Sequence, residues 1–233
     1  HNVGEFVEVG DAASLAQDFP AASFFADPAR RHEGRRATDW EEWEPAIPSL
    51  INWAAGRPRA AIKLGPGVPL EAVESWGIPR TEVVSYAGEC RETLLLLGDG
   101  WEPGVFAVLL GEGPVLTLPA GETPPTSRAK TWIGELDPAA RRVFAEPDGR
   151  LPMIGSTPGL RTSDEPLQSP WWRQTFRKVD EMPFDRKLLR RKLAELGVRL
   201  DAVKQGTGLP LDPAEIERDL NRRLVGPRSL VLL

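Results

Sequence analysis

The order of apolar and polar residues predicts short strands separated by short helices over the first half of the chain. Apolar or alternating runs bounded by Gly, Pro and Asp are typical of strands, and they occur at 4–10, 22–26, 60–64, 81–87, 92–97, 105–110 and 115–118. Apolar residues three and four positions apart predict helices at 49–55 and 70–76, with a helix or turn at 12–19. This alternation indicates an α/β fold built on a parallel sheet.

The segment 119–170 has a weaker pattern. Residues 119–128 are rich in Pro, Thr and Gly without periodicity, which is typical of a linker. Asp137-Pro138 predicts a helix over 139–146, because Asp favours the N-cap and Pro the first helical position. We therefore predict a linker with one connecting helix.

The most regular segment is 171–233. Strands are expected at 175–179, 199–204 and 229–233, and helices at 184–196 and from Asp212 to about 224. The first of these helices has an apolar face and ends at Gly197. The order β-α-β-α-β predicts a compact α+β module with two helices on one sheet.

Composition narrows the class of protein. Of 233 residues, 41% are hydrophobic and 27% are charged, which is ordinary for a soluble globular protein. No apolar run approaches the ~20 residues that a membrane span needs, and the N-terminus has no signal-peptide pattern. Cys90 is the single cysteine, so a disulfide within the chain and a multi-cysteine metal site are excluded. We expect a cytoplasmic protein without a metal.

The charge is unevenly distributed. Residues 171–233 contain 14 Lys and Arg against 9 Asp and Glu, a net charge of +5, whereas the whole chain has −5. This asymmetry fits a nucleic-acid-binding appendage on an acidic body, or a merely solvated surface. The same two interpretations apply to the basic face of the helix at 184–196, formed by Arg186, Lys187, Arg190, Arg191 and Lys192.

Two acids, Asp11 and Asp27, follow predicted strands. Ligand sites of parallel α/β sheets lie outside the carboxyl ends of the strands, where such an acid can accept a hydrogen bond from an exocyclic amine or a ribose hydroxyl. A carboxylate followed by Pro28 can also hold the amino group of a substrate base. The alternative is that each acid caps the next turn or helix.

Four arginines follow Asp27 within nine residues: Arg30, Arg31, Arg35 and Arg36. Guanidinium groups can bind phosphates, or these arginines can pair with nearby acids. Other routes to catalysis have little support, because His1 and His32 are the only histidines and there is neither a G-x-S-x-G elbow nor a Walker loop. Cys90 has no obvious local base and is expected to be an inert thiol.

Three blocks together suggest a family. They are Phe24-Phe25-Ala26-Asp27-Pro28-Ala29-Arg30-Arg31 with Gly34-Arg35-Arg36, Lys63-Leu64-Gly65-Pro66-Gly67, and Ser85-Tyr86-Ala87-Gly88-Glu89 with Glu92. The sequence resembles class I S-adenosylmethionine-dependent methyltransferases that carry a C-terminal THUMP-like domain. The last module, with Met182-Pro183-Phe184-Asp185 and Val203-Lys204-Gln205-Gly206, looks like that domain.

The resemblance implies a fold and a site. Residues 1–118 would be the C-terminal portion of a Rossmann-type methyltransferase sheet, 119–170 the connection and 171–233 the THUMP-like domain. Asp11 would contact the adenine of S-adenosylmethionine. Asp27 and Pro28 would match the catalytic Asp/Asn-Pro-Pro-aromatic motif, from which this sequence departs at its last two positions. Substrate RNA, from rRNA or tRNA, would be bound by the four arginines and Lys63.

The resemblance also implies a longer polypeptide. The glycine-rich loop after the first strand and the acid that holds the ribose are expected upstream of His1, so the chain by itself would bind cofactor poorly. Two other functions stay open. One is a non-catalytic RNA- or protein-binding scaffold that keeps the fold, and the other is a methyltransferase of small molecules or proteins. The oligomeric state is not predicted.

Overall fold

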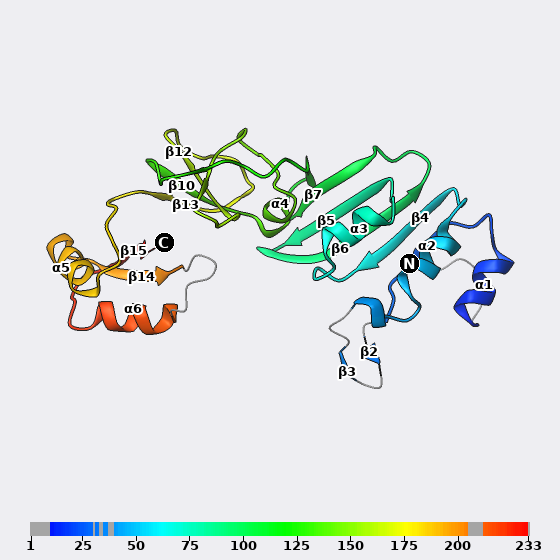
Figure 1. Ribbon diagram of the computed structural model, residues 1–233, viewed down its shortest axis with the longest axis horizontal. Coiled ribbons are helices and arrows are strands. Elements are labelled where there is room, and N and C mark those ends of the chain that lie inside the picture. The colour runs from blue at the N-terminus through cyan, green and yellow to red at the C-terminus, as the bar shows by residue number, and fades with distance from the viewer. Residues whose placement is uncertain (1–9, 30, 33–34, 37–39, 205–211, 233) are drawn as a thin grey trace. The chain divides into compact units, whose positions relative to one another are not determined.

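The computed structural model describes residues 10–29, 31–32, 35–36, 40–204 and 212–232. The chain forms two compact units (Figure 1). The first comprises His1–Thr123, Leu136–Arg150 and Gln168–Arg173, and the second comprises Pro124–Glu135, Leu151–Leu167 and Gln174–Leu233. These boundaries differ from the predicted divisions at 118 and 170, because the chain passes between the units several times. The strand predicted at 4–10 lies outside the described residues.

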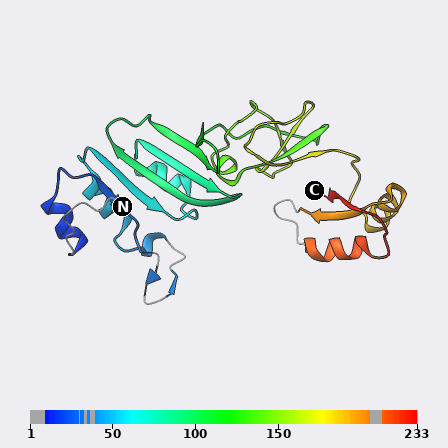
Figure 2. The same cartoon turned by 180° about the vertical axis from the view of Figure 1, so that it is seen from behind.

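The first unit is built on a six-stranded sheet in the order β1-β4-β6-β5-β7-β8, seen from both sides in Figures 1 and 2. Its strands are β1 (Phe24–Ala26), β4 (Arg59–Leu64), β5 (Arg80–Tyr86), β6 (Glu89–Gly98), β7 (Gly104–Leu110) and β8 (Leu116–Pro119). β1 pairs with β4 and β5 with β7 in parallel, whereas β6 is antiparallel to both β4 and β5, and β8 to β7. The expected parallel sheet is therefore a mixed one.

One face of this sheet carries a hydrophobic core. Helix α2 (Ile47–Ala54) directs Ile47 and Leu50 onto the sheet, and α3 (Leu70–Ser75) contributes Val73. On the strands, Ile62 of β4 lies opposite Leu95 of β6, and both are fully buried. The three- and four-residue spacing in α2 and the period of two in β4 place these side chains on one side, as the sequence pattern predicts.

A buried arginine fixes the chain that leads into β1. Arg57 follows α2 and is 6% exposed. Its guanidinium donates to the carbonyl oxygens of Phe19 at 2.7 Å and Ala22 at 3.0 Å, and to those of Ala16 and Trp53 at 2.5 Å. Ala16 belongs to α1 (Ala12–Asp18). One cation therefore ties the end of α1 and the turn before β1 to the end of α2.

A 3₁₀-helix and a short hairpin precede α2. The 3₁₀-helix η1 (Trp40–Glu42) brings Trp40 against Trp76, with ring centroids 5.3 Å apart in an edge-to-face arrangement. Between β1 and η1, strands β2 (Arg31–His32) and β3 (Arg35–Arg36) form an antiparallel hairpin.

The second unit contains a five-stranded sheet in the order β13-β10-β12-β11-β9. Its strands are β9 (Thr126–Ser127), β10 (Trp132–Leu136), β11 (Met153–Ile154), β12 (Leu160–Ser163) and β13 (Trp172–Arg177). Four of the five lie in the segment 119–170, which was predicted as linker. The predicted connecting helix is present as α4 (Pro138–Arg142), shorter than expected, and belongs to the first unit.

The C-terminal part of the second unit has the predicted element order. Helix α5 (Arg186–Leu196), strand β14 (Arg199–Val203), helix α6 (Pro213–Asn221) and strand β15 (Arg228–Leu232) follow β13. They enclose a small core of Leu193, Leu200, Ile216 and Leu220. The expectation of one sheet is wrong, because β14 and β15 form a separate parallel pair while β13 neighbours β10.

Candidate functional site

The predicted reaction centre lies where two parallel strands end. β1 pairs with β4 so that Ala26 is opposite Ile62, which makes Asp27 and Lys63 neighbours at the carboxyl ends of their strands. Lys63 Nζ donates to Asp27 Oδ2. The Asp27 side chain is 44% exposed and that of Lys63 is 26% exposed. The structure thus joins a predicted catalytic residue and a predicted substrate-binding residue in one solvent-accessible ion pair.

Pro28 fixes the backbone behind the Asp27 carboxylate. Pro28 is buried and has no N–H, so β1 cannot continue. The next residue is held from both sides, because the Ala29 N–H donates to the Glu44 carbonyl at 2.8 Å and the Glu44 N–H returns to the Ala29 carbonyl at 3.3 Å. The carboxylate is therefore presented from an anchored segment and not from a free loop.

The loop after β4 is held by a residue that sequence analysis missed. Arg142 of α4 donates to the carbonyl oxygens of Pro66 and Val68. Val68 is fully buried, so this clamp fixes the chain immediately after Lys63 and Leu64. No local motif could have revealed Arg142, because it lies more than seventy residues further along the chain.

Cys90 lies beside the same arginine. Burial raises the pKa of the Cys90 thiol, against the opposing effect of the charge and hydrogen bonding of Arg142. A raised pKa keeps the thiol protonated at neutral pH, and a protonated thiol is a poor nucleophile. The structure therefore supports the prediction that Cys90 is inert.

Asp11 caps a helix. Its Oδ1 accepts hydrogen bonds from the Ser14 N–H at 3.0 Å and the Ser14 hydroxyl at 3.2 Å, at the first turn of α1. The capping alternative is confirmed by this geometry. Among the described residues no contact joins Asp11 to Asp27, and a cofactor-binding role for Asp11 stays a prediction.

The predicted phosphate-binding arginines are described only in part. Arg30 lies outside the described residues, and so do the side chains of Arg31, Arg35 and Arg36. The backbones of these three form the β2–β3 hairpin, in which Arg31 is directly opposite Arg36. Their substrate-binding role stays a prediction.

The basic face of α5 is largely neutralised within the protein. Arg186 contacts Glu215 and Asp219 of α6 at 3.3 Å, and Arg190 contacts Asp219 at 2.9 Å. Two more cations are also paired, Lys192 with Asp180 at 2.8 Å and Arg191 with Glu195 at 3.7 Å. The predicted RNA-facing surface is therefore mainly a set of ion pairs.

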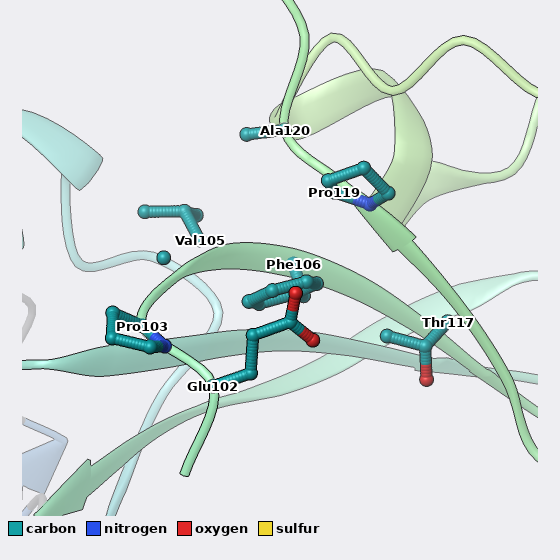
Figure 3. A pocket seen from close by; sticks show the side chains of 8 residues that line it. Glu102, Pro103, Val105, Phe106, Thr117, Pro119 and Ala120 are labelled. Atoms are coloured by element: carbon teal, nitrogen blue, oxygen red, sulfur yellow. The ribbon is translucent and has the colours of Figure 1, made fainter.

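The first unit also has an open pocket of about 510 Å³ (Figure 3). It is lined by Glu102, Pro103, Gly104, Val105, Phe106, Thr117, Pro119 and Ala120. These residues lie at the start of β7 and the end of β8. Asp27 lies at the carboxyl ends of β1 and β4, and these strands run in the same direction as β7. The pocket lies at the amino end of β7, so it is at the opposite end of the strands from Asp27.

Neither a metal site nor a membrane span is found in the part of the chain that the structure describes. Its described His, Cys, Asp and Glu residues form no group of three or more that could hold a metal ion. Its described helices are all too short or too polar to cross a bilayer.

Comparison with known proteins gives two relatives and one similar structure. No family model matches the chain. Proteins from two strains of Mycobacterium tuberculosis, CDC 1551 and H37Rv, each named as an uncharacterized S-adenosylmethionine-dependent methyltransferase, are 27% identical over 221 residues. The match covers 89% of this chain but 58% of each relative, so the chain spans little more than half their length.

The fold is shared with a crystal structure of a protein from Porphyromonas gingivalis W83 that is assigned as a methyltransferase. The TM-score is 0.65 at 18% sequence identity, over 94% of this chain and 57% of that one. At this identity the likeness concerns the fold alone.

Proposed function

We propose that this chain is part of an S-adenosylmethionine-dependent methyltransferase whose reaction centre is Asp27. Three observations support the proposal: the names of the M. tuberculosis relatives, the fold of the P. gingivalis protein, and the Asp27-Pro28 motif at the carboxyl end of β1. The observation that carries it is the exposed Asp27 carboxylate, held beside Lys63 where ligands of such sheets bind.

The described residues fit part of what this cofactor needs. Asp11 is exposed, and both of its contacts with Ser14 use Oδ1. Oδ2 can accept a hydrogen bond from the adenine amino group or a ribose hydroxyl. Asp11 would then hold the cofactor while it caps α1. The bound cofactor supplies a methyl group on a sulfonium centre, open to in-line attack.

Asp27 would orient the group that is methylated. Its carboxylate accepts hydrogen bonds, so it can hold an N–H or O–H of the substrate and direct the lone pair of that atom outward. Lys63 positions the carboxylate through the ion pair, and the anchored Pro28-Ala29 segment keeps the backbone from moving. The contribution of these residues is placement and electrostatics.

We propose RNA as the substrate class and 171–233 as a THUMP-like module that positions it. The support is the resemblance of this module and its net charge of +5. Because the cations of α5 are mostly paired, this helix is a weaker candidate for RNA binding than other surfaces of the module. A non-catalytic RNA- or protein-binding scaffold that keeps the fold is the second candidate, and in it the ion pair of Asp27 with Lys63 would be purely structural.

The test uses the full-length protein with radiolabelled S-adenosylmethionine and total RNA from a strain lacking the gene. Wild type, Asp27→Asn and Asp99→Asn are compared, the last as a control because Asp99 is an exposed acid directly after β6 and lies outside the proposed RNA-positioning module. We expect label in RNA with wild type and Asp99→Asn, and none with Asp27→Asn. Equal labelling by all three would overturn the role of Asp27. Cofactor binding by calorimetry without label in RNA would leave a methyltransferase of another substrate, and neither binding nor label would favour the scaffold.

A further inference from the structure

Two arginines without an ion pair among the described residues follow the end of α6, whereas most cations of α5 are paired. The acids of α6 are engaged, since Glu215 and Asp219 pair with α5 and Glu217 pairs with Arg228 at 2.8 Å. Arg222 and Arg223 follow the helix, are exposed, and form no ion pair with any described residue. The positive charge of this module is therefore displaced from the helix that the sequence indicated.

Two further arginines flank the turn that follows Arg223. Arg199 begins β14 and Arg228 begins β15, and the two are direct partners in the parallel pair. The Arg199 N–H donates to the Pro227 carbonyl at 2.9 Å, and its Nε donates to the Gly226 carbonyl at 2.8 Å. We call Arg199, Arg222, Arg223 and Arg228 the arginine patch. Among the described residues, only Arg228 of these four has an ion-pair partner, Glu217.

The backbone that carries the patch is tightly constrained. Arg223 has φ +66°, a left-handed conformation that residues other than glycine rarely adopt. Gly226 has φ +138°, and a Cβ there would come within 2.1 Å of the Gly197 carbonyl oxygen. The turn is therefore pressed against the end of α5. It presents its side chains from a fixed position, which lowers the entropic cost of binding a ligand.

We propose that the arginine patch binds the sugar-phosphate backbone of RNA, and this rests on the proposed RNA substrate. Guanidinium forks match phosphate oxygens in two-point hydrogen bonds, and like charges facing one another are relieved by a polyanion. Val225, 89% exposed within the same turn, offers apolar surface to a ribose or a base. An anionic membrane would be favoured by a larger apolar face, whereas here the apolar contribution is a single valine among cations.

A simpler role for these arginines is to stabilise the ends of the two helices. Cations near a helix C-terminus interact favourably with its dipole, and both α5 and α6 end here. That role predicts a loss of stability on substitution without a change in RNA affinity. Our proposal predicts the reverse, so the two are separated by measuring both quantities on each variant.

The experiment measures fluorescence anisotropy of a labelled single-stranded RNA of about 20 nucleotides, titrated with the full-length protein. The patch variant is Arg222→Glu with Arg223→Glu. The control is Lys187→Glu with Arg191→Glu, which makes the same charge change on the exposed face of α5. We expect the patch variant to raise Kd at least tenfold, and to lower the slope of log Kd against log salt by about 1.4, the value for two lost phosphate contacts. The control should change Kd less than threefold.

A second variant separates a loss of RNA binding from a loss of folding. Arg223→Gly keeps the positive φ, because glycine adopts it without strain, and removes one guanidinium. We expect unchanged thermal unfolding and a Kd raised about threefold to tenfold.

Three results would overturn the proposal. Equal effects of the patch and control variants would show a nonspecific charge effect. RNA binding that neither variant changes would show that RNA binds to a surface other than the arginine patch, and the proposed substrate class would remain. Binding to phosphatidylglycerol vesicles but not to RNA would overturn both the patch proposal and the RNA substrate.

Discussion

Ser85 Oγ donates a hydrogen bond to Asp137 Oδ1 at 2.6 Å, although the two residues are 52 positions apart in the chain. Ser85 lies in β5 and is fully buried, and Asp137 precedes α4 and is 4% exposed. The same carboxylate oxygen accepts the Ala139 N–H at 2.9 Å. The helix cap that the sequence predicted thus also joins α4 to the sheet.

The Ser85 hydroxyl should contribute measurably to stability. Ser85→Ala removes a donor from a buried carboxylate, which costs about 1–3 kcal/mol of unfolding free energy. Chemical denaturation checks this value. Ser75→Ala is the control, because its exposed hydroxyl contacts only the Ala72 carbonyl, and its effect should stay below about 0.5 kcal/mol. Equal values for the two variants would contradict the structure.

Substitution of the buried Arg57 should lower the stability of the first unit strongly. Arg57→Met keeps the aliphatic stem but leaves up to four carbonyl oxygens without their donor, and we expect a loss of about 3 kcal/mol in unfolding free energy. Arg91→Met serves as the control, because Arg91 is half exposed and Glu89 is its one ion-pair partner among the described residues. Exposed pairs contribute about 0–1 kcal/mol. A loss below 1 kcal/mol for Arg57→Met would contradict the hydrogen bonds from Arg57 to these carbonyl oxygens.

Lys63 should affect turnover through Asp27. If the proposed methyl transfer is observed, Lys63→Met should lower kcat by about tenfold to a hundredfold, because the carboxylate loses its fixed position. Lys63→Arg should recover most of the activity, since it restores the pair. Cofactor affinity should change little in either variant. An unaltered kcat for Lys63→Met would show that the ion pair has no positioning role.

The Asp185 cap should make the stability of α5 fall at acidic pH. The Leu188 and Lys187 N–H groups donate to its carboxylate at 2.8 Å and hold the pKa of Asp185 below its ordinary value. The charged cap therefore stabilises α5 above the ordinary aspartate pKa of about 3.9, and this contribution is lost as the pH falls through the lowered pKa.

NMR titration of the Lys187 and Leu188 amides measures this effect. Both should shift with a midpoint below about 3.9. Asp185→Asn should abolish the titration and keep α5 folded, because asparagine is an equally good N-cap. A midpoint at or above the ordinary value would contradict the hydrogen bonds that the structure shows.

Elements with strong local signals were predictable from the sequence. The hairpin at 105–118, the caps Asp137 and Asp212, and the stop at Gly197 lie where expected, because each depends on neighbouring residues alone. Strands β9, β10, β11 and β12 were missed. β9, β11 and β12 have two to four residues each in a Pro- and Gly-rich segment, and β9 and β10 pair with strands more than twenty residues away. Periodicity cannot be detected over two residues.

For the candidate site, the sequence indicated which residues to consider but not their contacts, and the roles of these residues stay predictions. Asp27 could be singled out because an apolar run ends there before Pro28, yet its pairing with Lys63 depends on the parallel register of β1 and β4. For α5 the sequence revealed the cations but not their neutralisation, because the acids of α6 lie nearly thirty residues further on. Charge counted along a chain differs from charge available on a surface.

The position of β6 determines how the six-stranded sheet can be assembled during synthesis. β4 and β5 follow one another in the chain but never pair, because β6 is the hydrogen-bonded neighbour of both. A nascent chain that ends before Glu89 therefore carries two strands with open edges on the sides where β6 will later insert. Residues 89–98 must be synthesised before the centre of the sheet can close, and until then the unpaired edges of β4 and β5 can pair with other chains.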